Sequence, residues 1–139
     1  MGTRAEIILK SPGCEERYQK IMDGYPAGVM NVLVSGIREL TPPGAQSVDL
    51  REISFSEVLR AEVAAGRLEP MAPSTRLGDV DFRYEIHVAA EMLEMRVYNR
   101  LPIGKLGEKP ALAPLFRGTL QDFTIWARDH LGDRIERQN

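Results

Sequence analysis

Hydrophobic and polar residues alternate along residues 80–99, and this is the clearest pattern in the chain. Alternation with a period of two is typical of strands that bury one face. A hairpin aligns its apolar positions when Val88 lies opposite Leu93. The same register pairs His87 with Glu94, Glu85 with Arg96, and Asp81 with Arg100. The pattern therefore predicts two antiparallel strands, although the turn residues also suit a helix over 88–99.

The clearest helix signal is a capping box at Ser54 and Glu57. The Ser54 hydroxyl is spaced to accept a hydrogen bond from the Glu57 amide, and the Glu57 carboxylate can reach back to the Ser54 amide. Apolar residues at helical spacing follow, and Gly66 is positioned to end the helix. The pattern predicts a helix over 55–65.

Three other segments have the spacing of apolar residues that is typical of helices, namely 14–22, 26–39 and 119–131. Thr119 is positioned to cap the last of them. The segment 26–39 is apolar on almost every side, which makes it the expected centre of the core. A buried strand over 29–34 fits the same residues, because a short apolar run does not distinguish a helix from a strand.

Short strands over 5–9 and 47–53 complete the predicted elements. Gly and Pro residues crowd 100–118, which indicates an irregular loop, and the polar tail after residue 132 is expected to fray. Together these elements predict an α+β fold, with a small, mainly antiparallel sheet built on the 80–99 hairpin and packed against about four helices. An α/β fold is the alternative, because strands and helices alternate through the first half.

The composition is that of one compact domain. The chain has 139 residues, of which 43% are hydrophobic, and its formal net charge is -2. This charge gives no global attraction to nucleic acid or to an anionic membrane. No apolar run approaches the roughly 20 residues of a membrane span. A single cysteine, Cys14, cannot form an internal disulfide, so a cytoplasmic location is expected.

No pattern of a known catalytic, metal or cofactor site occurs in the sequence, and no cofactor or metal is predicted. The sharpest candidate for chemistry is His87 with Glu85, two residues apart on one strand face, and Glu94 opposite them in the predicted hairpin. Arg83 and Arg96 lie among these acids. An ordinary ion-paired face therefore explains the same residues.

The best clue to binding is a basic segment over 96–117, which holds five cations and one acid. The cations are Arg96, Arg100, Lys105, Lys109 and Arg117. Gly104 and Gly107 would let backbone amides approach an anion closely. The segment therefore suits nucleic acid or a phosphate-bearing ligand, and a solvated loop is the structural alternative.

A non-catalytic protein-interaction or adaptor domain is the favoured function, because catalytic patterns are missing and the charge is near neutral. A nucleic-acid or phospholigand binding module that uses the basic 96–117 loop is the alternative, and a small enzyme centred on His87 is the second. The expected partner is a protein or a second copy of the chain. The apolar 26–40 segment and the sheet edges leave open a homodimer that buries them and a monomer in which other helices cover them. Nucleic acid is not the favoured partner, and no membrane contact is expected.

Overall fold

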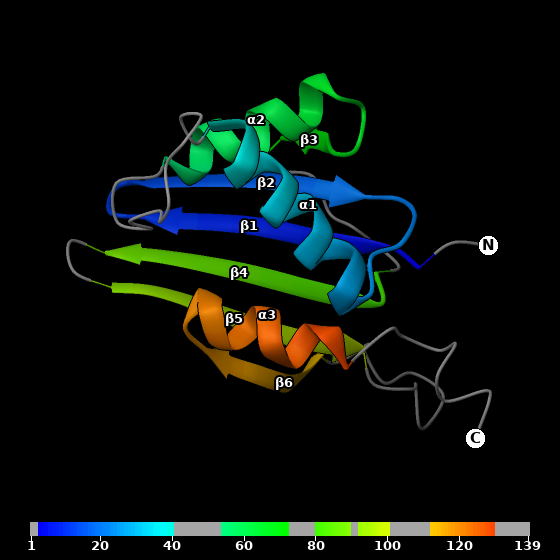
Figure 1. The fold of residues 1–139 in the computed structure, drawn as a ribbon. Helices are drawn as coiled ribbons and strands as arrows, with labels where there is room; N and C mark the ends of the chain where they lie inside the picture. Colours follow the sequence, from blue (N-terminus) through cyan, green and yellow to red (C-terminus); the bar gives the residue numbers. More distant parts are fainter. Residues whose placement is uncertain (1–2, 41–53, 73–79, 90–91, 101–111, 130–139) are drawn as a thin grey trace.

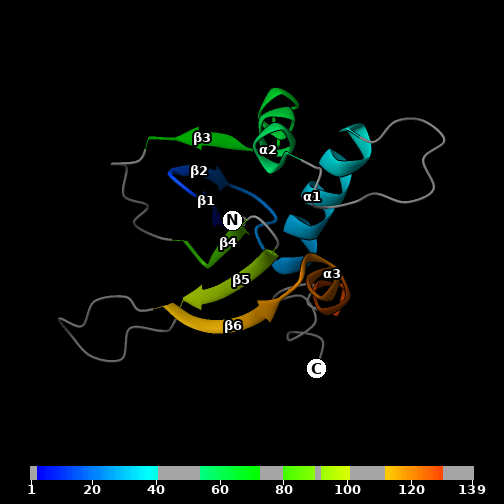
Figure 2. The same cartoon turned by 90° about the vertical axis from the view of Figure 1, so that its left-hand side faces the viewer.

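The computed structural model describes residues 3–40, 54–72, 80–89, 92–100 and 112–129. Their elements, in chain order, are β1 (Ala5–Ser11), β2 (Cys14–Lys20), α1 (Pro26–Leu40), α2 (Phe55–Ala64), β3 (Glu69–Met71), β4 (Phe82–Ala89), β5 (Met92–Arg100), β6 (Leu112–Gly118) and α3 (Leu120–Arg128). The three helices of these described ranges cover one face of the sheet (Figures 1 and 2).

Within the described residues the sheet has six strands in the order β3-β2-β1-β4-β5-β6. β1 and β4 are parallel, and the other neighbouring pairs are antiparallel. The prediction of a small, mainly antiparallel sheet packed against about four helices was therefore wrong, and the α/β alternative is closer. The parallel β1–β4 pair, which places the two hairpins side by side, is a long-range contact that local periodicity does not reveal.

The segment 14–22 is where the sequence prediction failed most clearly, because residues 14–20 form strand β2 instead of a helix. Tyr18 lies opposite Ile7 of β1 and is buried with it. Gly13, with φ of +75°, provides the tight turn between the two strands. Pairing with β1 thus outweighs a helical spacing that rested on few apolar residues.

Two further strands lie in segments for which the sequence predicted neither a strand nor a helix. β3 follows the predicted helix over 55–65, and β6 occupies 112–118 of the predicted loop. Both are edge strands of the described sheet and both contain a proline, Pro70 and Pro114, which an edge strand tolerates because one side needs no hydrogen-bond donor. The predicted strand over 47–53 and the tail after 132 lie outside the described residues.

The hairpin and its register are confirmed. Val88 pairs with Leu93, Glu85 with Arg96, and His87 with Glu94. The two helix starts that relied on caps are also confirmed. Ser54 accepts from the Glu57 amide at 3.3 Å, and Thr119 accepts from the Asp122 amide at 3.0 Å. Interactions between close neighbours in sequence were thus the most predictable part of the fold.

Most of the apolar surface of α1 is covered within the chain. Val29, Val32 and Leu33 are buried against the sheet and the other helices, and Met30 and Ile37 pack at the margin of the same core. The edge prolines also make pairing between sheet edges unfavourable. The described chain thus covers much of the apolar surface of α1 itself, and the homodimer alternative stays a prediction. No helix in the described ranges is long and apolar enough to cross a membrane.

Candidate functional site

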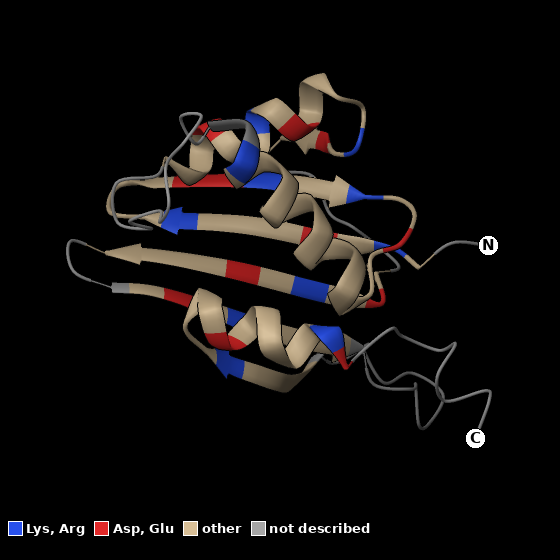
Figure 3. Ribbon diagram, in the orientation of Figure 1, with Lys and Arg blue, Asp and Glu red and all other residues tan. Residues whose placement is uncertain are grey.

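The sheet face opposite the helices, called the open face below, is covered by none of the described helices (Figure 2). The strand registers assign to it Glu6, Ile8 and Lys10 of β1, Glu15, Arg17 and Gln19 of β2, Glu69 of β3, Arg83, Glu85 and His87 of β4, Glu94, Arg96 and Tyr98 of β5, and Arg117 of β6. Figure 3 shows how these charged positions spread across the strands. The open face therefore collects every described candidate residue from the sequence whose side chain can be assigned to a face.

Glu85 lies at the centre of the open face and is only 6% exposed. Its carboxylate lies 3.0 Å from Arg83 Nε, 2.8 Å from His87 Nε2 and 3.7 Å from Lys10 Nζ. The His87–Glu85 contact agrees with the expectation that the two side chains share a face. However, Arg83 and Lys10 contact the same carboxylate, so Glu85 lies at the centre of a network of ion pairs.

A second buried carboxylate, Glu6, lies next to this group and is also 6% exposed. Arg17 Nη2 donates to it at 2.7 Å, and Arg83 Nε lies 3.6 Å away, so Arg83 links Glu6 to Glu85. Ile8 faces the same way yet is 2% exposed. None of the described helices covers it, and long charged neighbours on the same face can cover it with their stems. The charged side chains thus form a packed layer.

The third carboxylate, Glu94, pairs with Arg96 and Arg117 instead of with His87. Arg96 Nε donates to one of its oxygens and Arg117 Nε to the other, the latter at 3.0 Å. The hydrogen bonds from Arg96 and then from Arg117 lower the pKa of Glu94 below its ordinary value of 4.5. Glu94 is therefore held as an anion between two guanidinium groups, although its backbone lies opposite His87.

The basic segment predicted from the sequence is described only at its two ends. Arg96 and Arg117 are partners in the β5–β6 register. Arg100 is described only as the last residue of β5, while Lys105 and Lys109 lie outside the described residues. The structure therefore brings two of the five cations together, on the open face and around one carboxylate.

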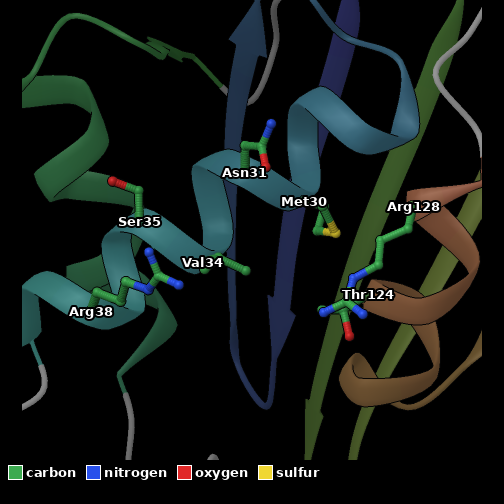
Figure 4. A pocket seen from close by; sticks show the side chains of 7 residues that line it. All are labelled: Met30, Asn31, Val34, Ser35, Arg38, Thr124 and Arg128. Carbon is green, nitrogen blue, oxygen red and sulfur yellow. The ribbon is translucent and has the colours of Figure 1, made fainter.

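Described residues on the helix side line two grooves that the sequence did not predict. The larger, of about 540 Å³, lies between α1 and α3 and is lined by Met30, Asn31, Val34, Ser35, Arg38, Thr124 and Arg128 (Figure 4). The smaller, of about 310 Å³, is lined by Lys20, Asp23, Tyr25, Gly28, Asn31, Val32, Ser35 and Arg67. Asn31 and Ser35 border both. The grooves arise from helix packing, which leaves no local signal in the sequence.

Asp23, at the edge of the smaller groove, has a left-handed backbone with φ of 56°. Its neighbours hold this conformation in place. The Gly24 amide donates to the Thr3 carbonyl at 2.9 Å, and the buried Tyr84 hydroxyl donates to the Gly24 carbonyl at 2.7 Å. A Cβ on Gly28 would lie 1.9 Å from the Asp23 carbonyl oxygen. The turn is therefore specified by several contacts, as is common where strained backbone is retained.

Two ionisable groups near the smaller groove have unusual surroundings. Glu62 is fully buried, and Arg67 donates to both of its carboxylate oxygens, through Nε to one and through Nη2 at 3.0 Å to the other. Arg67 Nη2 also lies 3.4 Å from the Ser35 hydroxyl. Burial lowers the pKa of Lys20, which lines the same groove. The buried carboxylate fixes the position of Arg67 at the groove.

Within the described ranges, no group of three His, Cys, Asp or Glu side chains could hold a metal ion. Cys14 is exposed at the first position of β2. Comparisons with protein-family models, curated proteins and solved structures find no match to this chain. The chemistry of its own surfaces is therefore the basis for assigning a function.

Proposed function

We propose that this chain is a non-catalytic protein-interaction domain, an adaptor whose docking surface is the open face. The observation that supports this most directly is the ion-pair network around Glu6, Glu85 and Glu94. The network restrains long side chains before a partner arrives. Docking against such a surface costs less side-chain entropy than docking against free arginines and lysines.

The charge balance of the open face favours a protein over a nucleic acid. Glu15 and Glu69 share this face according to the strand registers, as partners of Lys10 and Gln19. With them, the described residues of the face hold five acids and five cations, counting Lys10, Arg17, Arg83, Arg96 and Arg117. Nucleic acid is bound through a surplus of positive charge. A protein surface with charges of both signs is the complementary partner.

The residue types of the open face support the same partner. Four of its cations are arginines, and Tyr98 is half-buried on β5. Arginine and tyrosine are enriched at protein interfaces and among the residues that dominate binding energy. We therefore expect the docking site to centre on the β4–β5–β6 part of the face, where three of these arginines and Tyr98 lie.

The test begins with affinity capture from the native host after nuclease treatment, followed by titration of the purified partner by calorimetry. The double variant Lys10→Gln/Arg117→Gln removes two cations from the face but leaves Glu85 with Arg83 and Glu94 with Arg96. We expect it to bind the partner about tenfold more weakly or worse. A matched control, Arg60→Gln/Arg128→Gln, removes two exposed cations from helices and should keep wild-type affinity.

Equal weakening by the face variant and by the helix control would contradict docking at the open face. Titration with single- and double-stranded oligonucleotides at low and high salt separates the alternative function. Oligonucleotide binding would show that the partner is a nucleic acid if it is saturable, weakens steeply with salt and is reduced by Lys10→Gln/Arg117→Gln. We expect no such binding at low salt, where electrostatic attraction is strongest.

A further inference from the structure

The groove between α1 and α3 has an arginine at each end. The two helices lie side by side and run in opposite directions (Figure 1). Arg38 is in the last turn of α1, and Arg128 is in the last turn of α3, so they border the groove from opposite ends. Figure 4 shows Met30 and Val34 between them. The groove thus has two charged ends and an apolar middle.

These arginines differ from Arg67 of the smaller groove, because no described carboxylate pairs with them. Within the part of the chain that the structure describes, neither Arg38 nor Arg128 has an ion pair, and the groove lining contains no Asp or Glu. Both side chains are exposed. Their positive charge is therefore available to a ligand, which would have to displace water from the guanidinium groups.

Three neutral polar side chains, Asn31, Ser35 and Thr124, add hydrogen-bonding groups along the same groove. The Ser35 hydroxyl accepts from Arg67 Nη2 at 3.4 Å, which leaves its own hydrogen for a ligand acceptor. Thr124 donates to the Gln121 carbonyl at 2.7 Å, which leaves its oxygen as an acceptor. Ser35 and the two arginines thus offer donors to an oxygen-rich anion, whereas Thr124 offers an acceptor.

We propose that this groove binds a small linear ligand with an anionic group at each end, of the dicarboxylate class. One carboxylate would pair with Arg38 and the other with Arg128, since planar guanidinium groups match carboxylates in two-point hydrogen bonding. The connecting methylene chain would lie on Met30 and Val34, where its burial is favourable. This site lies on the opposite layer from the open face and does not depend on the function proposed for it.

The test is an NMR titration of the full chain with unbranched dicarboxylates of increasing length, and with the monocarboxylate of each length. We expect saturable shifts of the backbone amides of residues 30–38 and 124–128. One chain length should bind most tightly, because the two carboxylates must span the separation between Arg38 and Arg128. Its monocarboxylate should bind about tenfold more weakly, because one charge-assisted contact is lost.

Arg38→Gln and Arg128→Gln should each reduce dicarboxylate affinity to the monocarboxylate level. Arg60→Gln is the matched control, because it removes an exposed cation of α2 that does not line this groove. Thermal unfolding of each variant checks that the fold is kept, which the exposure of these arginines leads us to expect. Absence of saturable binding, equal affinity for dicarboxylates and monocarboxylates, or equal weakening by Arg60→Gln would each overturn the proposal.

Discussion

The hydroxyl of Tyr84, in the middle of the sheet, donates a 2.7 Å hydrogen bond to the backbone carbonyl of Gly24. The Tyr84 ring is fully buried and contacts Phe82 and Phe123. Burial raises its pKa well above the ordinary value of 10.0, so the hydroxyl keeps its proton. One side chain therefore joins the core to the turn that precedes α1.

Replacing Tyr84 with phenylalanine tests this link. Tyr84→Phe keeps the ring but leaves the Gly24 carbonyl without its donor in a buried position, which should lower the free energy of unfolding by about 1 to 3 kcal/mol. Urea denaturation measures the change. Tyr98→Phe is the control, because Tyr98 is half-buried on the open face and should change stability by less than about 0.5 kcal/mol. Equal midpoints for Tyr84→Phe and wild type would show that the hydrogen bond is not stabilising.

Local interactions explain which parts of this fold the sequence predicted. The caps at Ser54 and Thr119 lie three residues from their partners, and the hairpin register follows from charges on adjoining strands. β2 was missed because a strand with one buried aromatic, Tyr18, is recognisable only beside β1. The parallel β1–β4 pairing joins residues far apart in the chain and leaves no periodic signal.

The candidate sites also contain contacts between sequence neighbours, which were predictable, and contacts that depend on tertiary packing, which were not. The contact between His87 and Glu85 follows from their spacing on one strand, and the sequence predicted that they share a face. The pairing of Glu94 with two arginines depends on β6, which was predicted as a loop. The grooves depend on how α1 packs against its neighbours. Nothing in the sequence links Arg38 to Arg128, because their meeting at one groove depends on how α1 packs against α3.

The ion pair between buried Glu62 and exposed Arg67 predicts a double-mutant outcome. Arg67→Met leaves a fully buried carboxylate without its cation and should destabilise the protein by about 3 kcal/mol. Glu62→Met/Arg67→Met also removes the buried carboxylate and should recover most of that loss, since no buried charge is then left without a partner. Chemical denaturation compares the free energy of unfolding of the two variants with that of wild type. A double variant as unstable as Arg67→Met would rule out the buried charge as the cause.

Glu94 predicts a specific acid sensitivity. Its pKa in the folded protein is lowered below 4.5 by Arg96 and Arg117, so its contribution to stability is complete above pH 4.5 and is lost as the pH falls through the folded-state pKa. The denaturation midpoint of wild type should therefore fall on acidification below pH 4.5. Glu94→Gln should show a shallower fall, while Glu15→Gln, at an exposed position of the same face, should follow wild type. Parallel curves for all three proteins would contradict this role of Glu94.

The left-handed backbone of Asp23 predicts that glycine at this position stabilises the protein. This conformation costs most non-glycine residues about 1 to 2 kcal/mol and costs aspartate and asparagine less, whereas glycine adopts it freely but loses about 0.5 to 1 kcal/mol through greater freedom when unfolded. Asp23→Gly should therefore raise the free energy of unfolding by up to about 1 kcal/mol, measured by urea denaturation. Asp23→Asn removes the charge but keeps a residue that tolerates the same backbone conformation. Its free energy of unfolding should therefore stay within about 0.5 kcal/mol of the wild-type value. Gly28→Ala should lower the free energy of unfolding, since its Cβ would collide with the Asp23 carbonyl and force the turn open. If Asp23→Gly proves less stable than both wild type and Asp23→Asn, the turn is not strained, and the Asp23 side chain itself must stabilise it.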